Sequence, residues 1–384
     1  MAEAHEGVAI VKAPKHSNYL PSLDGWRAIA IVWVLVGHGQ GWTVGRFSDT
    51  WLRQNASYGV DLFFALSGFL ICGRLLDEEQ RFGGISLRSF YTRRLFRIQP
   101  AAMTYLAVVS ILLLCGVLKA PWSPVVGAAL MVRDFVPRHA GLWETAHFWS
   151  LSVEEHFYIF LPLLLLFMIR RNPTKPFARL PIVFAAIAVF CLACRFAVGW
   201  RQDGHINFWS CVFPTHLRID GLMFGVLICY FKRFQPRVFQ WMASWPGGWV
   251  VIAAAVAVLS IFPIESRQMH TWGFTLLYFA FGFVVAKAVN SEGPRPIRWM
   301  SYLLARIGVY SYSIYLWQMF FVWKVLAHLH IASPMLLYWT TIGGAILFGI
   351  AAAKIIEMPA LRFRDRFFPS VSKPLTEPVL VRAS

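Results

Sequence analysis

Residues 148–158 read FWSLSVEEHFY and run directly into IFLPLLLLFMI, residues 159–169. The two parts together are long enough to cross a bilayer as one helix, which needs about 20 residues. Glu154, Glu155 and His156 nevertheless stand within the stretch. Ionisable side chains at membrane depth are costly, so the two glutamates are functional candidates. The stretch therefore indicates a membrane helix that carries chemistry.

The composition of the whole chain indicates the same class of protein. Of its 384 residues, 58% are hydrophobic and 14% are charged. Soluble globular domains carry about a quarter charged residues, so this chain is strongly depleted in charge. Apolar runs of roughly 18 residues or more recur along its length. We therefore predict an all-α polytopic membrane protein in a bacterial inner membrane.

The formal net charge of +17 reflects topology rather than nucleic-acid binding. Basic residues cluster in the short segments between apolar runs, where the positive-inside rule places them. No nucleic-acid partner is expected. The six cysteines lie in or beside apolar runs, and the Cys191–Cys194 pair has no second ligand pair nearby. No metal site is therefore expected.

The apolar runs predict about ten membrane spans, with both ends of the chain in the cytoplasm. The first span serves as the insertion signal, because residues 1–20 lack the apolar core of a cleavable signal. One transmembrane domain, 21–362, is expected between this cytoplasmic segment and a disordered cytoplasmic tail, 363–384. The predicted spans are 23–43, 57–76, 99–119, 146–169, 180–200, 211–231, 247–264, 270–290, 303–327 and 333–356.

The first span, in SLDGWRAIAIVWVLVGHG (22–39), carries Arg27 and His38. Eleven residues are close to three helical turns, so these side chains share a face and lie about 16 Å apart along the axis. His38 is then expected in the outer half of the bilayer, where an imidazole can stay neutral and take up a proton. A packing histidine bonded to a neighbouring helix is the alternative.

Two further spans bring acidic residues to the same depth. Asp61 stands about one turn into the helix that begins at GVDLFFALSGFLI (59–71), and an interfacial helix cap is its alternative role. Glu154 and Glu155 lie about 12–14 Å from the outer end of their helix. Adjacent residues diverge by about 100°, so only one of them can face a given group. A purely structural ion pair is their alternative role.

Four arginines and one further aspartate complete the set of candidates. Arg218 and Asp220, in PTHLRIDGLMFG (214–225), stand at the outer end of the sixth span, where Arg218 is a natural counter-ion for Glu154 or Glu155. Three arginines stand at the cytoplasmic start of the third span, in SFYTRRLFRIQP (89–100): Arg93, Arg94 and Arg97. Guanidinium groups suit bidentate phosphate contacts, and enforcing topology is the alternative role. The separation of depths suggests a phosphate-bearing donor bound from the cytoplasm and chemistry nearer the far side.

Taken in order, these motifs resemble those of the acyltransferase-3 family, the bacterial integral-membrane O-acyltransferases. The resemblance covers about residues 20–360. Each motif alone is loose, but their shared order is specific. It is carried by LDGWRAIAIVWVLVGH, GVDLFFALSGFLI, YTRRLFRIQP, FWSLSVEEHFYIFLP, RIDGLMFGVL, GVYSYSIYLWQ and the closing Glu357-x-Pro359.

The resemblance implies transfer of an acyl group, usually acetyl from acetyl-CoA, to a sugar hydroxyl. It also implies that His38 is the catalytic base or acyl relay, that Arg27 accompanies it, and that Arg94 and Arg97 bind the phosphates of coenzyme A. Glu154 matches the fixed glutamate of the SxExxFY pattern. Two departures stand out: Gln318 replaces a histidine found in many members, and no esterase domain of the SGNH type follows in this chain.

The sequence therefore predicts a membrane O-acyltransferase. Acyl-CoA is the expected donor, bound by the arginine trio, while His38 activates the acceptor hydroxyl and Glu154 or Asp61 supports the imidazole. A cell-envelope or exported glycan is the expected acceptor, with a small-molecule glycoside or macrolide as the alternative. A lipid or glycan transporter is the competing class. Membrane lipids are further partners, and a homo-oligomer is left open.

Overall fold

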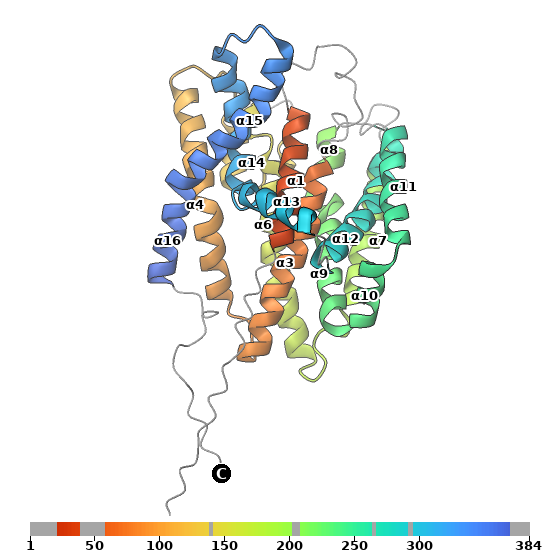
Figure 1. Cartoon of the computed structure of the whole chain (residues 1–384). Helices are drawn as coiled ribbons and strands as arrows, with labels where there is room; N and C mark the ends of the chain where they lie inside the picture. Colours follow the sequence, from red (N-terminus) through yellow and green to blue (C-terminus); the bar gives the residue numbers. More distant parts are fainter. Residues whose placement is uncertain are drawn as a thin grey trace, which may run out of the picture.

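The computed structural model describes residues 21–38, 58–137, 141–201, 208–262, 266–290 and 295–368. Within these ranges the chain is helical and contains no strand, which confirms the all-α prediction. Most of the longer helices run roughly along one axis (Figure 1). The α-helices are α1 Pro21–His38, α3 Gly59–Phe82, α4 Leu87–Leu114, α5 Ser123–Ala129, α6 Phe148–Arg171, α7 Leu180–Arg201, α8 Phe208–Val212, α9 Ile219–Phe234, α10 Pro236–Ser244, α11 Gly247–Ile261, α12 Phe274–Asn290, α13 Arg295–Gly308, α14 Ser311–Phe320, α15 Pro334–Ala352 and α16 Met358–Phe367.

Short 3₁₀ and π-helical segments connect or extend these helices. They are η3 Arg133–Phe135, η5 Trp143–Thr145, η6 Thr215–Leu217, η7 Met269–Gly273, η8 Phe321–Val325, η9 Leu326–His328 and η10 Ala353–Glu357. Through η10, α15 and α16 continue as one 34-residue helical stretch. The helix therefore passes the predicted domain boundary at residue 362, and residues 369–384 of the predicted tail lie outside the described residues.

Several helices have the length and composition of membrane spans. Among the described residues they are Gly59–Phe82, Leu87–Leu114, Trp143–Arg171, Leu180–Arg201, Met269–Asn290 and Pro334–Phe367. The pair of α10 and α11, bent by 64°, adds a seventh if it is one broken span. Asp24, Arg27 and His38 lower the hydropathy of the 18-residue α1. A polytopic membrane protein is thus supported, while ten spans and a cytoplasmic position of both ends stay predictions.

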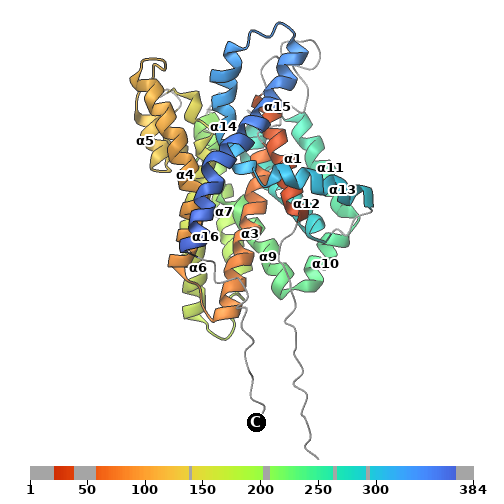
Figure 2. The same ribbon diagram turned by 60° about the vertical axis from the view of Figure 1, so that its left-hand side comes forward.

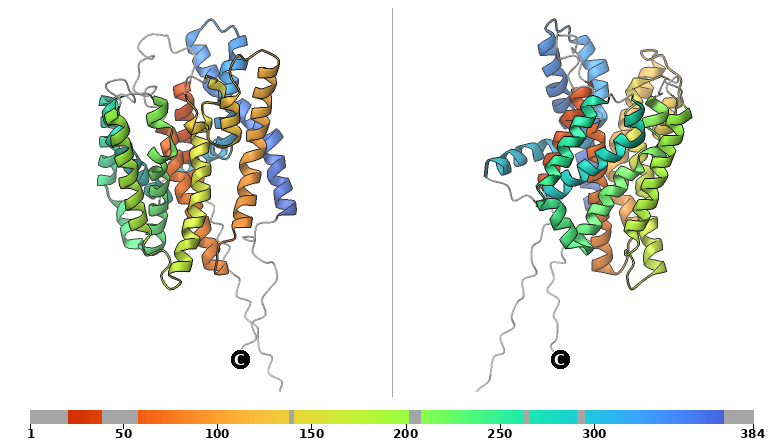
Figure 3. Two further views of the ribbon diagram at one scale, coloured as in Figure 1. Left: turned by 180° about the vertical axis from the view of Figure 1, so that it is seen from behind. Right: turned by 90° about the vertical axis from the view of Figure 1, so that its right-hand side faces the viewer.

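The predicted span 303–327 is divided in the structure. Helix α13 ends at Gly308, and α14 begins at Ser311 with a different direction. Figure 2 and the right-hand view of Figure 3 show α13 lying across the bundle axis. A Cβ atom at Gly308 would lie 1.8 Å from the carbonyl oxygen of Asp24, so glycine permits this close contact with the start of α1.

Close packing of α3 on α9 forms the centre of the bundle. A Cβ atom at Gly68 would lie 1.9 Å from the carbonyl oxygen of Leu222, and one at Gly225 would lie 2.2 Å from that of Ala65. Small residues let membrane helices approach backbone to backbone in this way. The contact brings the first turns of α3 and α9 together, and these turns carry Asp61 and Asp220.

Candidate active site

Two neighbouring cavities collect most of the ionisable residues singled out in the sequence. The first, here called the arginine cavity, has a volume of about 80 Å³ and is lined by Arg27, Val60, Phe63, Phe64, Ser67, Arg94, Arg97, Ile98, Ser150, Leu151, Glu154, Tyr158, Ser311, Tyr312 and Tyr315. The second, the histidine cavity, has a volume of about 120 Å³ and is lined by Val34, His38, Tyr58, Val60, Asp61, Trp143, Ala146, His147, Trp149, Val212, Phe213, Arg218, Phe274, Tyr315 and Met319. Val60 and Tyr315 line both cavities, so the two spaces are separated by little more than these side chains.

Three guanidinium groups give the arginine cavity its charge. Arg97 of α4 pairs with Glu357 of η10, which also accepts a 2.5 Å hydrogen bond from Ser313. Arg27 of α1 lies 3.3 Å from Asp24. Arg94 lies over the Tyr158 ring, 4.9 Å from its centroid. Because no carboxylate lies within ion-pair distance of Arg94 among the described residues, its charge is available to an anionic ligand.

Glu154 lies in the arginine cavity rather than beside His38. Its two carboxylate oxygens accept 2.9 Å hydrogen bonds, one from the Ser67 hydroxyl and one from the Tyr158 hydroxyl. It thereby connects α6 to α3 close to Arg94. The adjacent Glu155 lines neither cavity and has no ion-pair partner among the described residues. The 100° divergence of adjacent helical residues explains why only one of the two glutamates reaches this space.

The arginine trio is not a single group in the structure. Arg94 and Arg97 line the cavity, but Arg93 does not. Its guanidinium group lies 3.0 Å from Glu78 of α3 and also donates to the Ser89 hydroxyl. The face of α4 that carries Arg94 and Arg97 therefore points inward, while Arg93 joins α4 to the end of α3.

His38 lies in the histidine cavity at the end of α1. Its side chain keeps an accessible surface there, although atoms of neighbouring helices surround the ring and Gln318 of α14 lies next to it. Arg27 lines one cavity and His38 the other, as expected for two side chains on one face of α1. The helix therefore presents a cation and an imidazole to two adjoining spaces.

Asp61 and Arg218 form a buried ion pair in the histidine cavity. The Arg218 guanidinium also lies 3.7 Å from the centroid of the Phe274 ring. The pairing of Arg218 with Glu154 or Glu155 that the sequence analysis predicted is therefore wrong. The reason is the α3–α9 contact, which brings the first turn of α3, rather than α6, against the start of α9.

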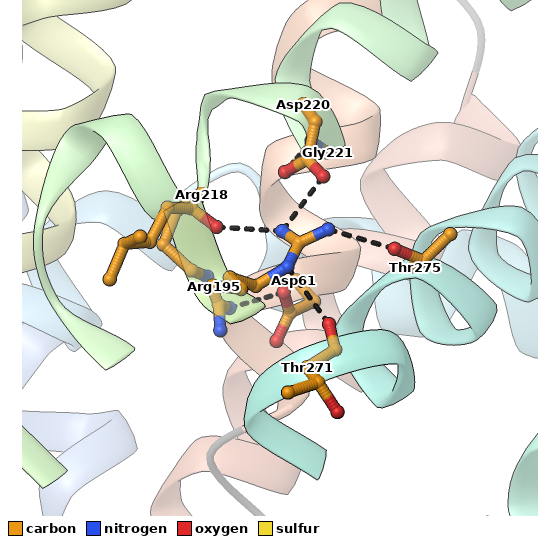
Figure 4. Close-up of polar contacts among 8 residues, drawn as sticks. Asp61, Arg195, Arg218, Asp220, Gly221, Thr271 and Thr275 are labelled. Carbon is orange, nitrogen blue, oxygen red and sulfur yellow. Dashed lines mark hydrogen bonds and ion pairs between the residues drawn. The ribbon is translucent and has the colours of Figure 1, made fainter. Parts of the chain in front are cut away.

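A second buried ion pair lies beside the first (Figure 4). Arg195 of α7 and Asp220 of α9 approach to 2.8 Å, and their side chains are almost inaccessible to solvent. Arg195 also donates to the Leu217 carbonyl oxygen at 2.8 Å, to the Thr275 hydroxyl at 2.8 Å and to the Thr271 carbonyl oxygen at 3.0 Å. This guanidinium group therefore ties α7, η6, η7 and α12 to the start of α9, next to Arg218.

Sequence reasoning missed three residues that belong to this region. Arg195 is a lone arginine in the apolar run VFAAIAVFCLACRFAVGW. A charged residue within such a run is expected to have an acidic partner, so the sequence did contain a signal for this ion pair. His147 directly precedes α6 and lines the histidine cavity, and Tyr315 stands between the cavities. The Tyr315 hydroxyl lies 2.7 Å from that of Ser150 and donates to the His147 carbonyl oxygen at 3.1 Å.

The arrangement combines an anion-binding space with a basic side chain in an adjoining one. The arginine cavity suits a phosphate group, because guanidinium donors match phosphate oxygens in geometry and charge. The imidazole of His38 can accept a proton from a hydroxyl group that enters the histidine cavity. Over the described part of the chain, no cluster of three or more His, Cys, Asp or Glu side chains could hold a metal ion.

Comparison with known proteins gives a consistent result over most of the chain. A family model described as an acyltransferase domain matches residues 20–355. A Staphylococcus aureus protein (strain MRSA252) with a provisional O-acetyltransferase name is 27% identical over 392 residues, covering 92% of this chain and 60% of its own length. The O-acetyltransferase OatA of Staphylococcus aureus (strain NCTC 8325) is 25% identical over 322 residues, covering 78% of this chain and 50% of its own length. The chain therefore spans little more than half the length of these relatives. No solved structure matches it significantly.

Proposed function

The chain belongs to the acyltransferase-3 family, and from that premise we propose that it moves an acyl group from acyl-CoA to a hydroxyl group of a glycan. Acetyl is the proposed acyl group, in keeping with the names of the relatives. A single observation supports this most strongly: a cationic cavity and a histidine-bearing cavity adjoin across Val60 and Tyr315. A two-substrate transfer needs this kind of arrangement, with one binding space for each substrate and a base where they meet.

The arginine cavity is the proposed binding space for the phosphates of the donor. Arg94 has charge to offer there, and Arg27 and Arg97 add guanidinium groups that are paired with Asp24 and Glu357. Glu154, bonded to Ser67 and Tyr158, offsets part of this positive charge and fixes the shape of the cavity. Its proposed role is therefore to organise the donor site. Of the two carboxylates predicted to support the His38 imidazole, Asp61 rather than Glu154 is proposed for this role, because Asp61 lines the same cavity as His38.

Proton transfer at His38 is the proposed chemical step. The imidazole accepts the proton of the acceptor hydroxyl, whose oxygen forms the new ester bond with the acyl carbon. The carbon–sulfur bond of the thioester breaks, and the coenzyme A thiolate leaves and takes up the proton that His38 had accepted. In the second form of this step, the His38 imidazole first accepts the acyl group and the coenzyme A thiolate leaves. The hydroxyl oxygen of the acceptor then attacks the acyl-histidine, and the imidazole is released. Asp61 stabilises the imidazolium in either form.

The proposed acceptor is a cell-envelope or exported glycan, and the proposed location is the bacterial inner membrane. A small-molecule glycoside or macrolide is the alternative acceptor. The competing class, a lipid or glycan transporter, differs in its chemistry, because it would move its substrate without consuming acyl-CoA. Release of free coenzyme A therefore separates the two classes.

The test measures release of free coenzyme A from acetyl-CoA by inverted membrane vesicles, with crude cell-envelope glycan as acceptor. Wild type is compared with His38→Ala and Glu154→Gln at matched protein levels. His330→Ala is the control, because His330 is exposed and lines neither cavity. The proposal predicts release by wild type and the control, and strongly reduced release by the other two variants. Full release by His38→Ala would contradict it.

A further inference from the structure

Hydrogen-bonding groups without a partner gather around the histidine cavity. Among the described residues, three of its lining side chains have buried polar atoms that make no hydrogen bond of good geometry: the Tyr58 hydroxyl, both ring nitrogens of His147 and Nη1 of Arg218. Gln318 lies outside this lining; it is fully buried and within hydrogen-bonding reach of the His38 ring. The three lining residues come from separate parts of the chain, so the fold brings them together around one space.

The Leu316 backbone lies within hydrogen-bonding reach of the His147 ring and can pair with only one of its two nitrogens. The His147 ring lies against the rings of Tyr105, at 5.4 Å, and Tyr315, at 5.6 Å, and both neighbouring hydroxyls donate elsewhere. Folded proteins leave few buried polar groups unpaired, because each one costs free energy. A concentration of them around one cavity therefore indicates a polar occupant. A volume of about 120 Å³ holds several water molecules, or one end of a larger substrate that displaces them.

The charge and the walls of the cavity define that occupant further. Arg218 is balanced by Asp61, so the lining carries no excess charge while the two histidines are neutral. The Trp149 ring is stacked on Phe213, with centroids 4.6 Å apart and planes 7° apart. Phe274 adds a further aromatic face. An occupant that fits has hydroxyl groups at its edge, an apolar face and no net charge.

We propose that the histidine cavity is the acceptor subsite and that it selects an uncharged, hydroxyl-bearing ring. This inference rests on the proposed function and adds the residues that hold the acceptor: Tyr58 and His147, together with Nη1 of Arg218. A carboxylate on the ring would compete with Asp61 for Arg218 and would leave a surplus charge in a buried space. The subsite therefore discriminates against acidic rings.

Equilibrium dialysis of the purified chain in detergent, with p-nitrophenyl glycosides as probes, tests the subsite without requiring catalysis. The neutral probes are the glucoside, galactoside and N-acetylglucosaminide, and the acidic probe is the glucuronide. We expect at least one neutral probe to bind, and to bind about tenfold or more tightly than the glucuronide. Failure of all three neutral probes to bind at 10 mM, or equal binding of the glucuronide, would overturn the inference.

Variants then connect binding to the named residues. Tyr58→Phe and His147→Phe remove hydrogen-bonding groups of the lining while keeping an aromatic ring, and each is expected to weaken binding of the neutral probe about tenfold. Tyr230→Phe is the matched control, because this buried tyrosine lines neither cavity. Unchanged binding by both test variants would overturn the subsite. Binding of a neutral probe without any coenzyme A release would instead support the subsite and contradict the proposed function.

Discussion

Removal of the Arg195 guanidinium group should destabilise the fold strongly. The change Arg195→Met keeps much of the side-chain length but deletes the ion pair with Asp220 and the hydrogen bonds to Leu217, Thr271 and Thr275. Both members of the pair are almost fully buried, so solvent screening does little to reduce the effect. Loss of one partner leaves an uncompensated buried charge on the other, which typically costs about 3–5 kcal/mol.

The assay is reversible unfolding in mixed micelles, titrated with sodium dodecyl sulfate and followed by circular dichroism. The expected loss for Arg195→Met is about 3–5 kcal/mol in the free energy of unfolding. Asp220→Asn should cost a similar amount, because it leaves the guanidinium group without its anion. The double variant Arg195→Met/Asp220→Asn should cost less than the sum of the two, because no unpaired charge is left. A loss below about 1 kcal/mol for Arg195→Met, or strict additivity, would refute this reasoning.

Three further predictions concern the cavities and the helix contact. Arg94→Gln should raise the KM for acyl-CoA by about tenfold or more in vesicle kinetics, because it removes a charge-assisted phosphate contact. Arg93→Gln should change this KM little. Equal effects of the two variants would contradict the assignment of Arg94, but not Arg93, to the inward face of α4. Tyr315→Phe should lower kcat several-fold with little change in either KM, because it removes the hydrogen bonds to Ser150 and His147 that hold this ring between the cavities. An unchanged kcat would count against that role. Gly68→Ala should lower the free energy of unfolding by about 1–3 kcal/mol in the same micelle titration, because its Cβ atom would lie 1.9 Å from a backbone oxygen of α9. An unfolding free energy equal to that of the wild type would disprove the close contact.

The class of protein and most of its helices could be predicted from apolar runs alone. The sequence positions of α3, α6, α7 and α12 overlap the predicted spans closely. The division at Gly308 was not found from apolar content alone, because Arg295–Gly308 is an amphipathic helix whose last residues, LLARIG, merge with the apolar run that follows. Hydropathy reports burial in lipid or protein, and it does not report the angle between successive helices.

The candidate site was predictable in depth along each helix but not in direction around it. The predicted depths of His38 and Asp61 along their helices correctly placed both residues in one region. It could not assign Asp61 as the partner of Arg218, because that choice depends on which helices touch, and the α3–α9 contact arises from tertiary packing. Arg93 shows the same limitation: it is adjacent to Arg94 in the sequence, yet it faces a different neighbour.

The central claim is that His38 takes part in transfer of an acyl group from acyl-CoA to a hydroxyl group. Its most direct test is to supply radiolabelled acetyl-CoA and a neutral p-nitrophenyl glycoside to inverted vesicles and to measure label in the glycoside ester. The account predicts ester formation by wild type and His330→Ala, and its loss in His38→Ala with the protein correctly inserted. Ester formation by His38→Ala at the wild-type rate would contradict the account.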